Sequence, residues 1–152
     1  MRLFILAAAA TAAIVTVASA QAPSPAQTIQ MRQANYKQMG AAMKGLSDEL
    51  RSATPAIAAV RRHAQLFATH APQLLRWFPA GTGPESGIRT RAKAEIWSDP
   101  EGFRRAGAGL LLASRDLSAA ARGGDVAAIR AAFRALGRAC AGCHDPYRAP
   151  ES

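Results

Sequence analysis

Val, Ile and Thr are scarce in this 152-residue chain once its first twenty residues are set aside, whereas alanine is abundant. β-Branched side chains fit strands best and alanine has the highest helix propensity, so a fold built on β-sheets is not expected. With 49% hydrophobic and 19% charged residues, the composition also excludes collagen-like, low-complexity and wholly disordered chains. We therefore predict a single all-α domain that is long enough to bury a hydrophobic core.

A basic tract is also missing, although 19 Lys and Arg outnumber 10 Asp and Glu and give a formal net charge of +9. Arginine is spread along every predicted helical segment without aromatic interleaving, so we expect no nucleic-acid partner. The pattern indicates a solvated basic surface. Attraction to acidic redox partners or membrane surfaces is the functional alternative.

The first twenty residues are typical of a Sec-type signal peptide. Arg2 provides a short positive n-region, an apolar stretch runs from Leu3 to Val17, and Ala18-Ser19-Ala20 matches an A-x-A cleavage site. The alternative is a membrane anchor, but the apolar run is short for a spanning helix, which needs about 20 residues, and no charged stop follows it. The sequence predicts a signal peptide over 1–20, export to the periplasm, and one domain over 21–152.

Four segments carry apolar residues at alternating spacings of three and four, which is the a/d pattern of bundle helices. Their predicted limits follow from capping residues: the first spans Pro25 to Arg51, the second starts at Thr54 and Pro55, the third at Asp99 and Pro100, and the fourth after Gly123-Gly124-Asp125. We predict an antiparallel up-down-up-down four-helix bundle. A long Gly/Pro-rich crossover, Trp77 to Ser98, joins the second and third helices, and loops of that length are often functional.

Both cysteines lie in one short motif, Cys140-Ala141-Gly142-Cys143-His144. This C-x-x-C-H pattern is the covalent attachment signal for a c-type haem. Two thiols three positions apart share one helix face, here the apolar stripe of the fourth segment, and the next residue offers an imidazole to the iron. A C-x-x-C redox disulfide lacks its usual βαβ context here, and a zinc site would need further Cys or His ligands nearby.

A second protein ligand to the iron would have to come from the upstream helices, because only residues 145–152 follow His144. The chemically suitable side chains are methionine and histidine, namely Met31, Met39, Met43, His63 and His70. We expect the two histidines at the helix surface, because neither belongs to the apolar stripe of the second segment.

Further short motifs accompany the haem motif along nearly the whole mature chain: Tyr147-Arg148 after it, Arg32-Gln33, Phe78-Pro79-Ala80-Gly81-Thr82-Gly83, Thr90-Arg91-Ala92-Lys93 and Glu95-Ile96-Trp97. In this combination the chain resembles the cytochrome c′ family. The resemblance implies one covalently bound haem c that is high-spin and five-coordinate, with His144 as the only protein ligand. It also implies binding of NO and CO, a capacity for electron transfer, and a homodimer formed through the first two helices.

The resemblance implies roles for six further residues. Arg32 and Gln33 match the haem-edge pair of the family, with the arginine near a propionate. Tyr36 falls where a side chain covers the distal face of the iron, and Arg148 matches the arginine beside the proximal histidine. Two residues of the crossover match a segment that passes the haem edge, namely Thr90 and Arg91.

The residues themselves leave alternatives open at two of these positions. Arg32 is a charge within an otherwise apolar stripe, which points either to an anionic partner or to an arginine snorkelling at a helix end. Tyr36 either covers the iron or simply packs in the core with its hydroxyl satisfied elsewhere. Pro146 departs from the family pattern, and we expect it to bend or end the fourth helix before Arg148.

Two other functions remain open. One is a six-coordinate low-spin electron carrier with Met39 as the sixth ligand. The other is a minor enzymatic role such as NO or peroxide reduction. The sequence shows no dedicated acid–base pair for such a reaction, so we do not expect an enzyme.

Overall fold

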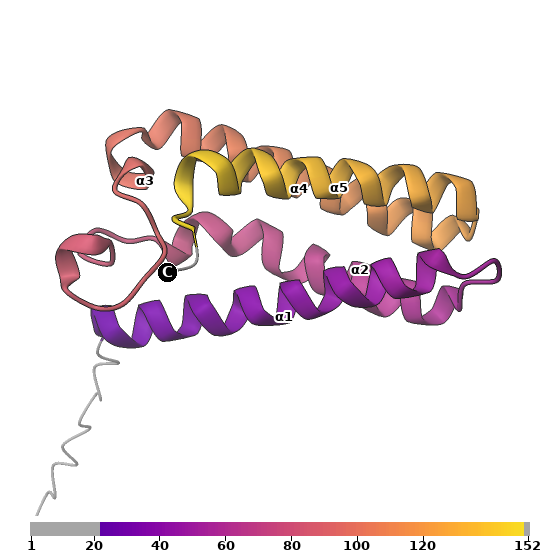
Figure 1. The fold of residues 1–152 in the computed structure, drawn as a ribbon, viewed down its shortest axis with the longest axis horizontal. Coiled ribbons are helices and arrows are strands. Elements are labelled where there is room, and N and C mark those ends of the chain that lie inside the picture. Colours follow the sequence, from indigo (N-terminus) through magenta and orange to yellow (C-terminus); the bar gives the residue numbers. More distant parts are fainter. Residues whose placement is uncertain (1–21, 151–152) are drawn as a thin grey trace, which may run out of the picture.

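The computed structural model describes residues 22–150, and its regular structure is helical. Four long helices form an antiparallel bundle (Figure 1): α1 (Pro25–Arg51), α2 (Ile57–His70), α4 (Pro100–Gly123) and α5 (Val126–Tyr147). The crossover between α2 and α4 contains the 3₁₀ segments η1 (Ala71–Trp77) and η2 (Pro84–Ser86) and the short helix α3 (Glu95–Ser98). The predicted all-α bundle with its long crossover is thus confirmed.

The signal peptide predicted over 1–20 lies outside the described residues. Within residues 22–150, none of the helices combines the length and the apolar character needed to cross a membrane.

Short polar residues determine where three of the long helices begin. Ser24 accepts a hydrogen bond from the backbone of Gln27, and the Gln27 side chain accepts one from the backbone of Ser24, which completes a capping box at α1. Asp99 caps α4 and Asp125 caps α5, as predicted. Gly124 adopts the left-handed conformation that ends α4, so α5 turns back directly alongside it.

The start predicted for α2 at Thr54 is wrong. The helix begins at Ile57, and its N-cap residue Ala56 has no side chain that can cap it. Glu49 of α1 instead accepts a hydrogen bond from the Ala56 backbone, at 3.0 Å. A side chain from the preceding helix therefore holds the residue from which α2 starts.

Prolines shape the ends of α2 and α5. α2 gives way to η1 after His70, and Pro72 lies in the first turn of η1, where no backbone donor is required. Pro146 lies inside the last turn of α5, which ends one residue later at Tyr147. Arg148 is therefore the first residue beyond the helix and has an extended backbone, in line with the prediction that the helix would stop before it.

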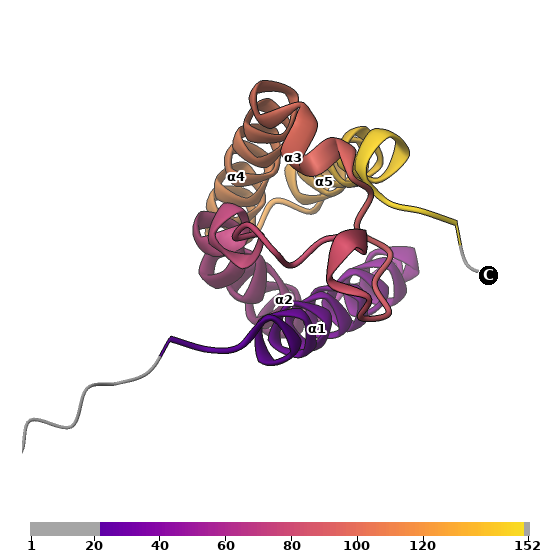
Figure 2. The same ribbon diagram turned by 90° about the vertical axis from the view of Figure 1, so that its left-hand side faces the viewer.

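The bundle is closed on three sides and open on the fourth. α5 packs along α4, α4 along α2 and α2 along α1, whereas α1 and α5 make few contacts with each other. Figure 2 shows the bundle end-on, with the crossover lying over one end of it. The opening between α1 and α5 therefore leads from solvent toward the core.

The two histidines of α2 are partly exposed, and both also contact residues of neighbouring segments. The ring of His63 occupies the space beside Gly45, where any larger side chain would collide with it. His70 Nε2 lies 3.3 Å from Gln38 Oε1, and its ring packs edge-on against Trp77. A glycine on the neighbouring helix, which the α2 stripe does not reveal, makes the room for His63.

Candidate functional site

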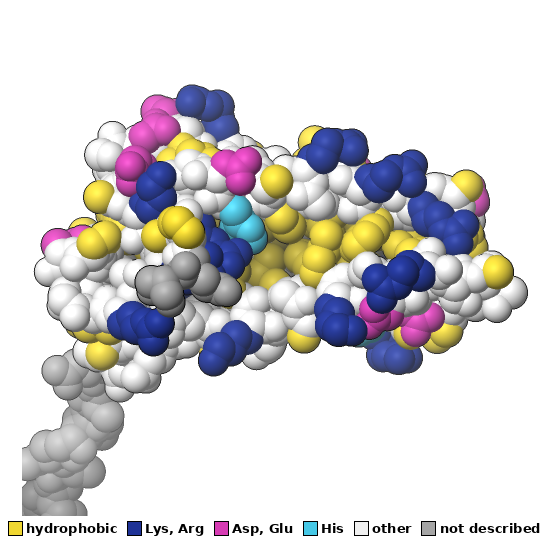
Figure 3. Space-filling view, viewed as in Figure 1, with side chains coloured by type: hydrophobic (Ala, Val, Ile, Leu, Met, Phe, Trp, Pro, Cys, Tyr) yellow, Lys and Arg dark blue, Asp and Glu magenta, His cyan; other side chains and the backbone are white. Residues whose placement is uncertain are grey.

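A cavity of about 550 Å³ lies inside the bundle at the end covered by the crossover. The space-filling view shows it as a hollow with hydrophobic side chains at its floor and a histidine at its edge (Figure 3). Its lining includes all nine residues singled out from the sequence, which are Arg32, Gln33, Tyr36, Thr90, Arg91, Cys140, Cys143, His144 and Arg148. Residues far apart in the sequence thus meet in one place.

The wall of this cavity is largely apolar, whereas its polar residues come from α1, the crossover and the C-terminal turn of α5. The apolar lining includes Phe67, Leu74, Phe78, Ile96, Phe103 and Leu110. The sequence does not mark these side chains as cavity residues, because nothing in an apolar stripe distinguishes a wall residue from a core residue. An apolar chamber with a few polar groups is typical of sites for large flat cofactors, and a haem with its two propionates fits this arrangement.

The two thiols of the motif are half-buried and face the cavity from α5. Burial raises the pKa of Cys140, and burial together with the neighbouring Cys140 raises the pKa of Cys143 to about 11. A redox-active C-x-x-C site depends on a thiol of lowered pKa. The environment of these cysteines therefore disfavours the disulfide-exchange alternative.

The surroundings of His144 favour the neutral imidazole, the protonation state that metal ligation requires. Burial lowers its pKa, the cations of Arg148 and Arg91 lower it further, and Asp145 partly opposes them. The imidazole is consequently neutral near pH 7 and retains a lone pair for a metal. Within residues 22–150 no group of three or more His, Cys, Asp or Glu is arranged to hold a metal ion, so a multi-ligand zinc site is not supported.

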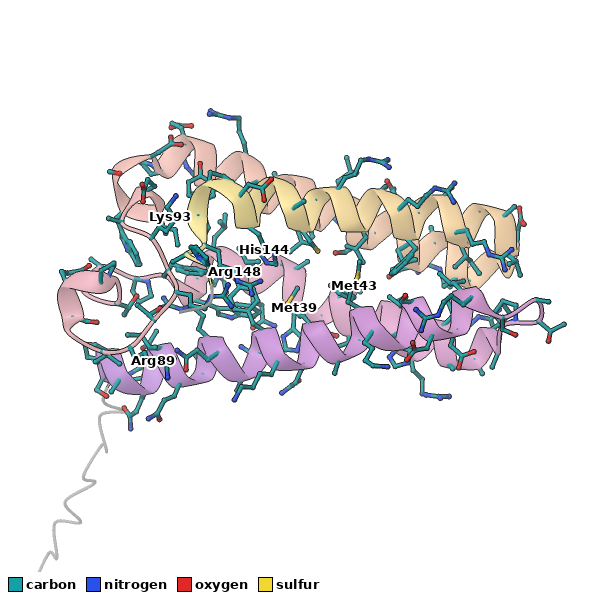
Figure 4. All side chains as sticks on the ribbon, viewed as in Figure 1. Met39, Met43, Arg89, Lys93, His144 and Arg148 are labelled. Atoms are coloured by element: carbon teal, nitrogen blue, oxygen red, sulfur yellow. The ribbon has the colours of Figure 1, made fainter. Side chains whose placement is uncertain are left out.

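Arg148 lies directly beside this histidine, with its Nη1 atom 3.3 Å from His144 Nδ1. Figure 4 shows both side chains in the gap between α1 and α5. A guanidinium can only donate hydrogen bonds, so Nδ1 is the acceptor and Nε2 carries the proton of the neutral ring. The hydrogen bond from Arg148 therefore stabilises the tautomer with a protonated Nε2, which is the form of His144 when Nε2 is not bound to a metal.

Arg32 is only 2% exposed although it carries a charge. Its two terminal nitrogens donate to the carbonyl of Trp77, to the hydroxyl and carbonyl of Thr82, and to the hydroxyl of Thr90, at 3.0 to 3.3 Å. The guanidinium also lies 4.4 Å above the ring of Phe78. All of these partners are neutral and burial lowers the pKa of Arg32, so the arginine is not snorkelling to solvent and its charge calls for an anion in the cavity.

The crossover is tied to both ends of the site. Gln33 of α1 donates to the carbonyl of Arg89 at 3.1 Å. On the other side, the Arg91 side chain donates to the carbonyl of Ala149, and the Ala149 backbone donates back to the carbonyl of Arg91. This pairing of crossover and C-terminal tail was not predicted, because it depends on the extended backbone beyond α5 and has no signature in the sequence.

Tyr36 enters the cavity from α1 within a cluster of aromatic rings. Its ring packs edge-on against Trp77, with centroids 5.5 Å apart, and at 6.4 Å from Phe78. Burial raises its pKa, Cys143 and Cys140 across the cavity raise it further, and the phenol remains protonated at neutral pH. It can therefore donate a hydrogen bond inside the cavity.

Only two of the five candidates for a sixth iron ligand line the cavity. Met39 and Met43 do so from α1 (Figure 4). Met31 is 47% exposed, and the two histidines of α2 are absent from the lining. A sixth ligand from these candidates could therefore come only from buried Met39 or partly buried Met43 of α1.

The sequence profile of the cytochrome C′ family matches residues 27–148. The chain belongs to the cytochrome c′ family. It is 36% identical to the cytochrome c′ of Rhodospirillum rubrum over 142 residues, which cover 93% of this chain and 95% of that one. The crystal structure of cytochrome c′ from Thermochromatium tepidum matches 84% of this chain and 98% of its own, with a TM-score of 0.79 and 32% identity. As a cytochrome c′, the chain carries a covalently attached haem c.

Structures of a third member have been solved with gases bound. A variant of cytochrome c′ from Alcaligenes xylosoxidans in complex with nitric oxide matches 86% of this chain and all of its own, at 26% identity and a TM-score of 0.76. Another variant of the same protein, with carbon monoxide bound, matches at 27% identity and a TM-score of 0.74, over 84% of this chain and 98% of its own.

Proposed function

We propose that this cytochrome c′ binds NO and CO at a five-coordinate, high-spin haem. The observation that carries the proposal is that the two thiols, the imidazole and the buried cation surround a single apolar cavity. Cys140 and Cys143 form the thioether bonds, and His144 is the only protein ligand. The haem supplies an iron with one open coordination position, at which small gases bind.

Arg32 orients the haem through the propionates, aided by Gln33, Thr90 and Arg91. Support for this assignment comes from the burial of the guanidinium among neutral partners. An anion brought next to it would offset the cost of burying the charge. Gln33 and Arg91 hold the crossover against α1 and against the C-terminal tail, so they keep the cover of the cavity in place.

Tyr36 covers the distal side of the iron in this proposal. Trp77 and Phe78 hold its ring from one side, and its protonated phenol is available to a bound gas or to water. A bulky ring in this position slows the entry of ligands. Arg148 lies beside His144, and its hydrogen bond to Nδ1 would favour the unligated imidazole if a bound gas weakened the bond between His144 and iron.

One observation supports the electron-carrier alternative: Met39 lines the same cavity as Tyr36 and comes from the same helix. In that alternative the thioether sulfur of Met39 is the sixth ligand. Met39 is 6% exposed and packs within the hydrophobic core cluster, and this packing supports a structural role for it in our proposal.

The homodimer is proposed to form through α1 and α2. The outward side of α1 supports this, because a row of exposed side chains there carries no charge: Gln27, Met31, Ala34, Gln38 and Ala41. A solved cytochrome c′ described by its ligand-controlled dimer dissociation matches this chain with a TM-score of 0.79 at 28% identity. Sedimentation of the purified protein with and without CO tests the dimer.

Two experiments test the proposed haem site and its setting. Acid–acetone extraction of the native protein should leave the haem on the polypeptide, whereas a Cys140→Ala/Cys143→Ala variant should release it. Fractionation of the producing cells should place the mature protein in the periplasm, with cleavage after Ala20. Quantitative loss of haem from the native protein would show that the thiols are not its attachment points.

A further inference from the structure

A second, shallower hollow of about 490 Å³ lies along the gap between α1 and α5. Its lining includes Gly40, Met43 and Ser47 from α1 and Phe133 from α5, and we call it the α1–α5 groove. Gly40 and Met43 line both this groove and the haem cavity. Any molecule seated in the groove therefore lies directly next to the haem.

The fold keeps this groove open. Arg130 of α5 donates to the carbonyls of Leu50 and Ser52, which joins the two helices at the end far from the haem cavity. Between that link and the crossover, α1 and α5 make few contacts, and a Cβ atom at Gly137 would lie 3.6 Å from the end of the Met43 side chain. The side chains that line the groove, among them Met43 and Phe133, leave the hollow unfilled.

Basic side chains border the groove on both helices, as Figure 3 shows by the Lys and Arg atoms on either side of the hydrophobic band. On α1, Lys44 and Arg51 share the single carboxylate of Asp48, so this side keeps one excess positive charge. On α5, Arg134 and Arg138 are exposed. Arg134 follows Phe133, which lines the groove, and Arg138 follows Gly137, which lies next to the groove residue Met43. Neither arginine makes an ion pair within the described part of the chain.

We propose that the α1–α5 groove is the docking surface for an acidic redox protein that exchanges electrons with the haem. The inference rests on the proposed haem site, since the groove matters for electron exchange only because it borders that site. The donor loses one electron, the ferric iron gains it and becomes ferrous, and no bond or proton is exchanged. Carboxylates on the partner would face basic borders on both sides of an apolar floor.

The shape of the surface favours a protein over a membrane. The apolar floor is recessed between two charged borders, where a flat bilayer would not reach it. The large exposed hydrophobic side chains of residues 22–150 are Met31, Leu75 and Leu112, and none of them lines the groove. A convex acidic partner fits such a surface better than lipid does.

The test uses holoprotein and reduced flavodoxin, a small acidic flavoprotein, as the surrogate donor in stopped-flow mixing. In the groove variant, Arg134→Glu with Arg138→Glu, the second-order reduction rate at low ionic strength should fall by about tenfold or more, because steering by complementary charge is lost. High salt should remove the difference. The matched control is Arg115→Glu with Arg122→Glu on α4, which changes the net charge equally and should alter the rate less than twofold.

Three results would overturn the proposal. Equal slowing in the groove and control variants would mean that net charge alone governs the reaction, and no slowing in either would mean that the groove is not used. The third result is that the wild-type protein sediments with phosphatidylglycerol–phosphatidylcholine vesicles and the groove variant does not, while flavodoxin reduces both at the same rate. This result would identify the groove as a membrane-binding face instead. Optical spectra and CO binding of every variant should match the wild type. If the wild-type holoprotein itself fails to bind CO, the proposed gas-binding function fails, while the rate comparison still decides the docking proposal.

Discussion

The hydroxyl of Tyr147 donates a 2.7 Å hydrogen bond to Oδ2 of Asp99, which joins the last turn of α5 to the first turn of α4. Asp99 uses its other oxygen to cap α4 through the backbone of Gly102. Gly102 has to be a glycine, because any Cβ there would collide with both side chains. This link fixes the end of α5 just beyond Pro146, where the helix would otherwise fray, and so it positions His144 three residues earlier.

Tyr147→Phe should make the protein less stable at neutral pH and nearly as stable as the wild type in acid. The Tyr147 hydroxyl is the main cause of the lowered pKa of Asp99, with the Gly102 backbone second. A carboxylate with a lowered pKa stabilises the fold above its unfolded pKa of about 3.9, and this contribution is lost as the pH falls through the folded value. Urea unfolding at pH 7 and at low pH measures the effect.

Asp99→Asn and the double variant provide the control for this prediction. If the charge of the Asp99 carboxylate carries the pH dependence, Tyr147→Phe in the Asp99→Asn background should change stability equally at pH 7 and in acid, because an amide still accepts the hydrogen bond but does not titrate. A stability difference between Tyr147→Phe and the wild type that stays the same from pH 7 into acid would contradict the account.

The sequence predicts the fold well where the cause is local. Asp99 and Asp125 are short acidic residues just before apolar periodicity, and both cap helices. Arg32 stands out as a charge within an apolar stripe, and it is buried at the cavity. In each case the residue and its neighbours along one helix contain the reason.

Features that depend on two distant segments could not be predicted. The position of the His63 ring depends on Gly45 in the neighbouring helix, and the residue before α2 is held by Glu49 of α1. The pairing of Arg91 with Ala149 needs the extended chain beyond α5. The apolar periodicity within one segment does not reveal such contacts, because each contact forms only when the helices pack against each other.

Arg32→Met should destabilise the holoprotein by about 3 kcal/mol, since it leaves the buried acceptors Trp77 carbonyl, Thr82 and Thr90 without their donor. Arg32→Lys should lose less, because an ammonium keeps the charge but reaches fewer of these acceptors. Urea unfolding followed by circular dichroism measures both. Arg115→Met, at an exposed position of α4, is the control and should change stability by less than about 0.5 kcal/mol; an equal loss in both methionine variants would argue against a special role for Arg32.

Tyr36→Ala should speed CO association with the ferrous protein on the order of tenfold, which corresponds to a barrier lowered by about 1.4 kcal/mol. The ring held by Trp77 and Phe78 is removed, so the distal side opens. Tyr36→Phe keeps the ring and should leave the association rate close to that of the wild type. Flash photolysis of the CO complex measures all three rates, and unchanged kinetics in Tyr36→Ala would mean that Tyr36 is a core residue and another side chain guards the iron.

Arg148→Ala should make His144 harder to displace when NO binds. The arginine donates to Nδ1 of His144 and thereby stabilises the ring in its unligated form. Without that bond, the ratio of histidine-bound to histidine-free NO complex should rise about fivefold, the equivalent of about 1 kcal/mol. Electron paramagnetic resonance of the ferrous NO complex distinguishes the two forms. A ratio that stays the same or falls would show that Arg148 does not favour release.

The optical spectrum of the reduced holoprotein, recorded without added ligand and then with CO and NO, tests the central claim most directly. A high-spin, five-coordinate spectrum that shifts on addition of either gas is the result that this account predicts, because in our proposal Tyr36 rather than Met39 covers the iron. A sharp low-spin α-band in the ligand-free ferrous protein that disappears in Met39→Ala would contradict it and establish the six-coordinate electron carrier.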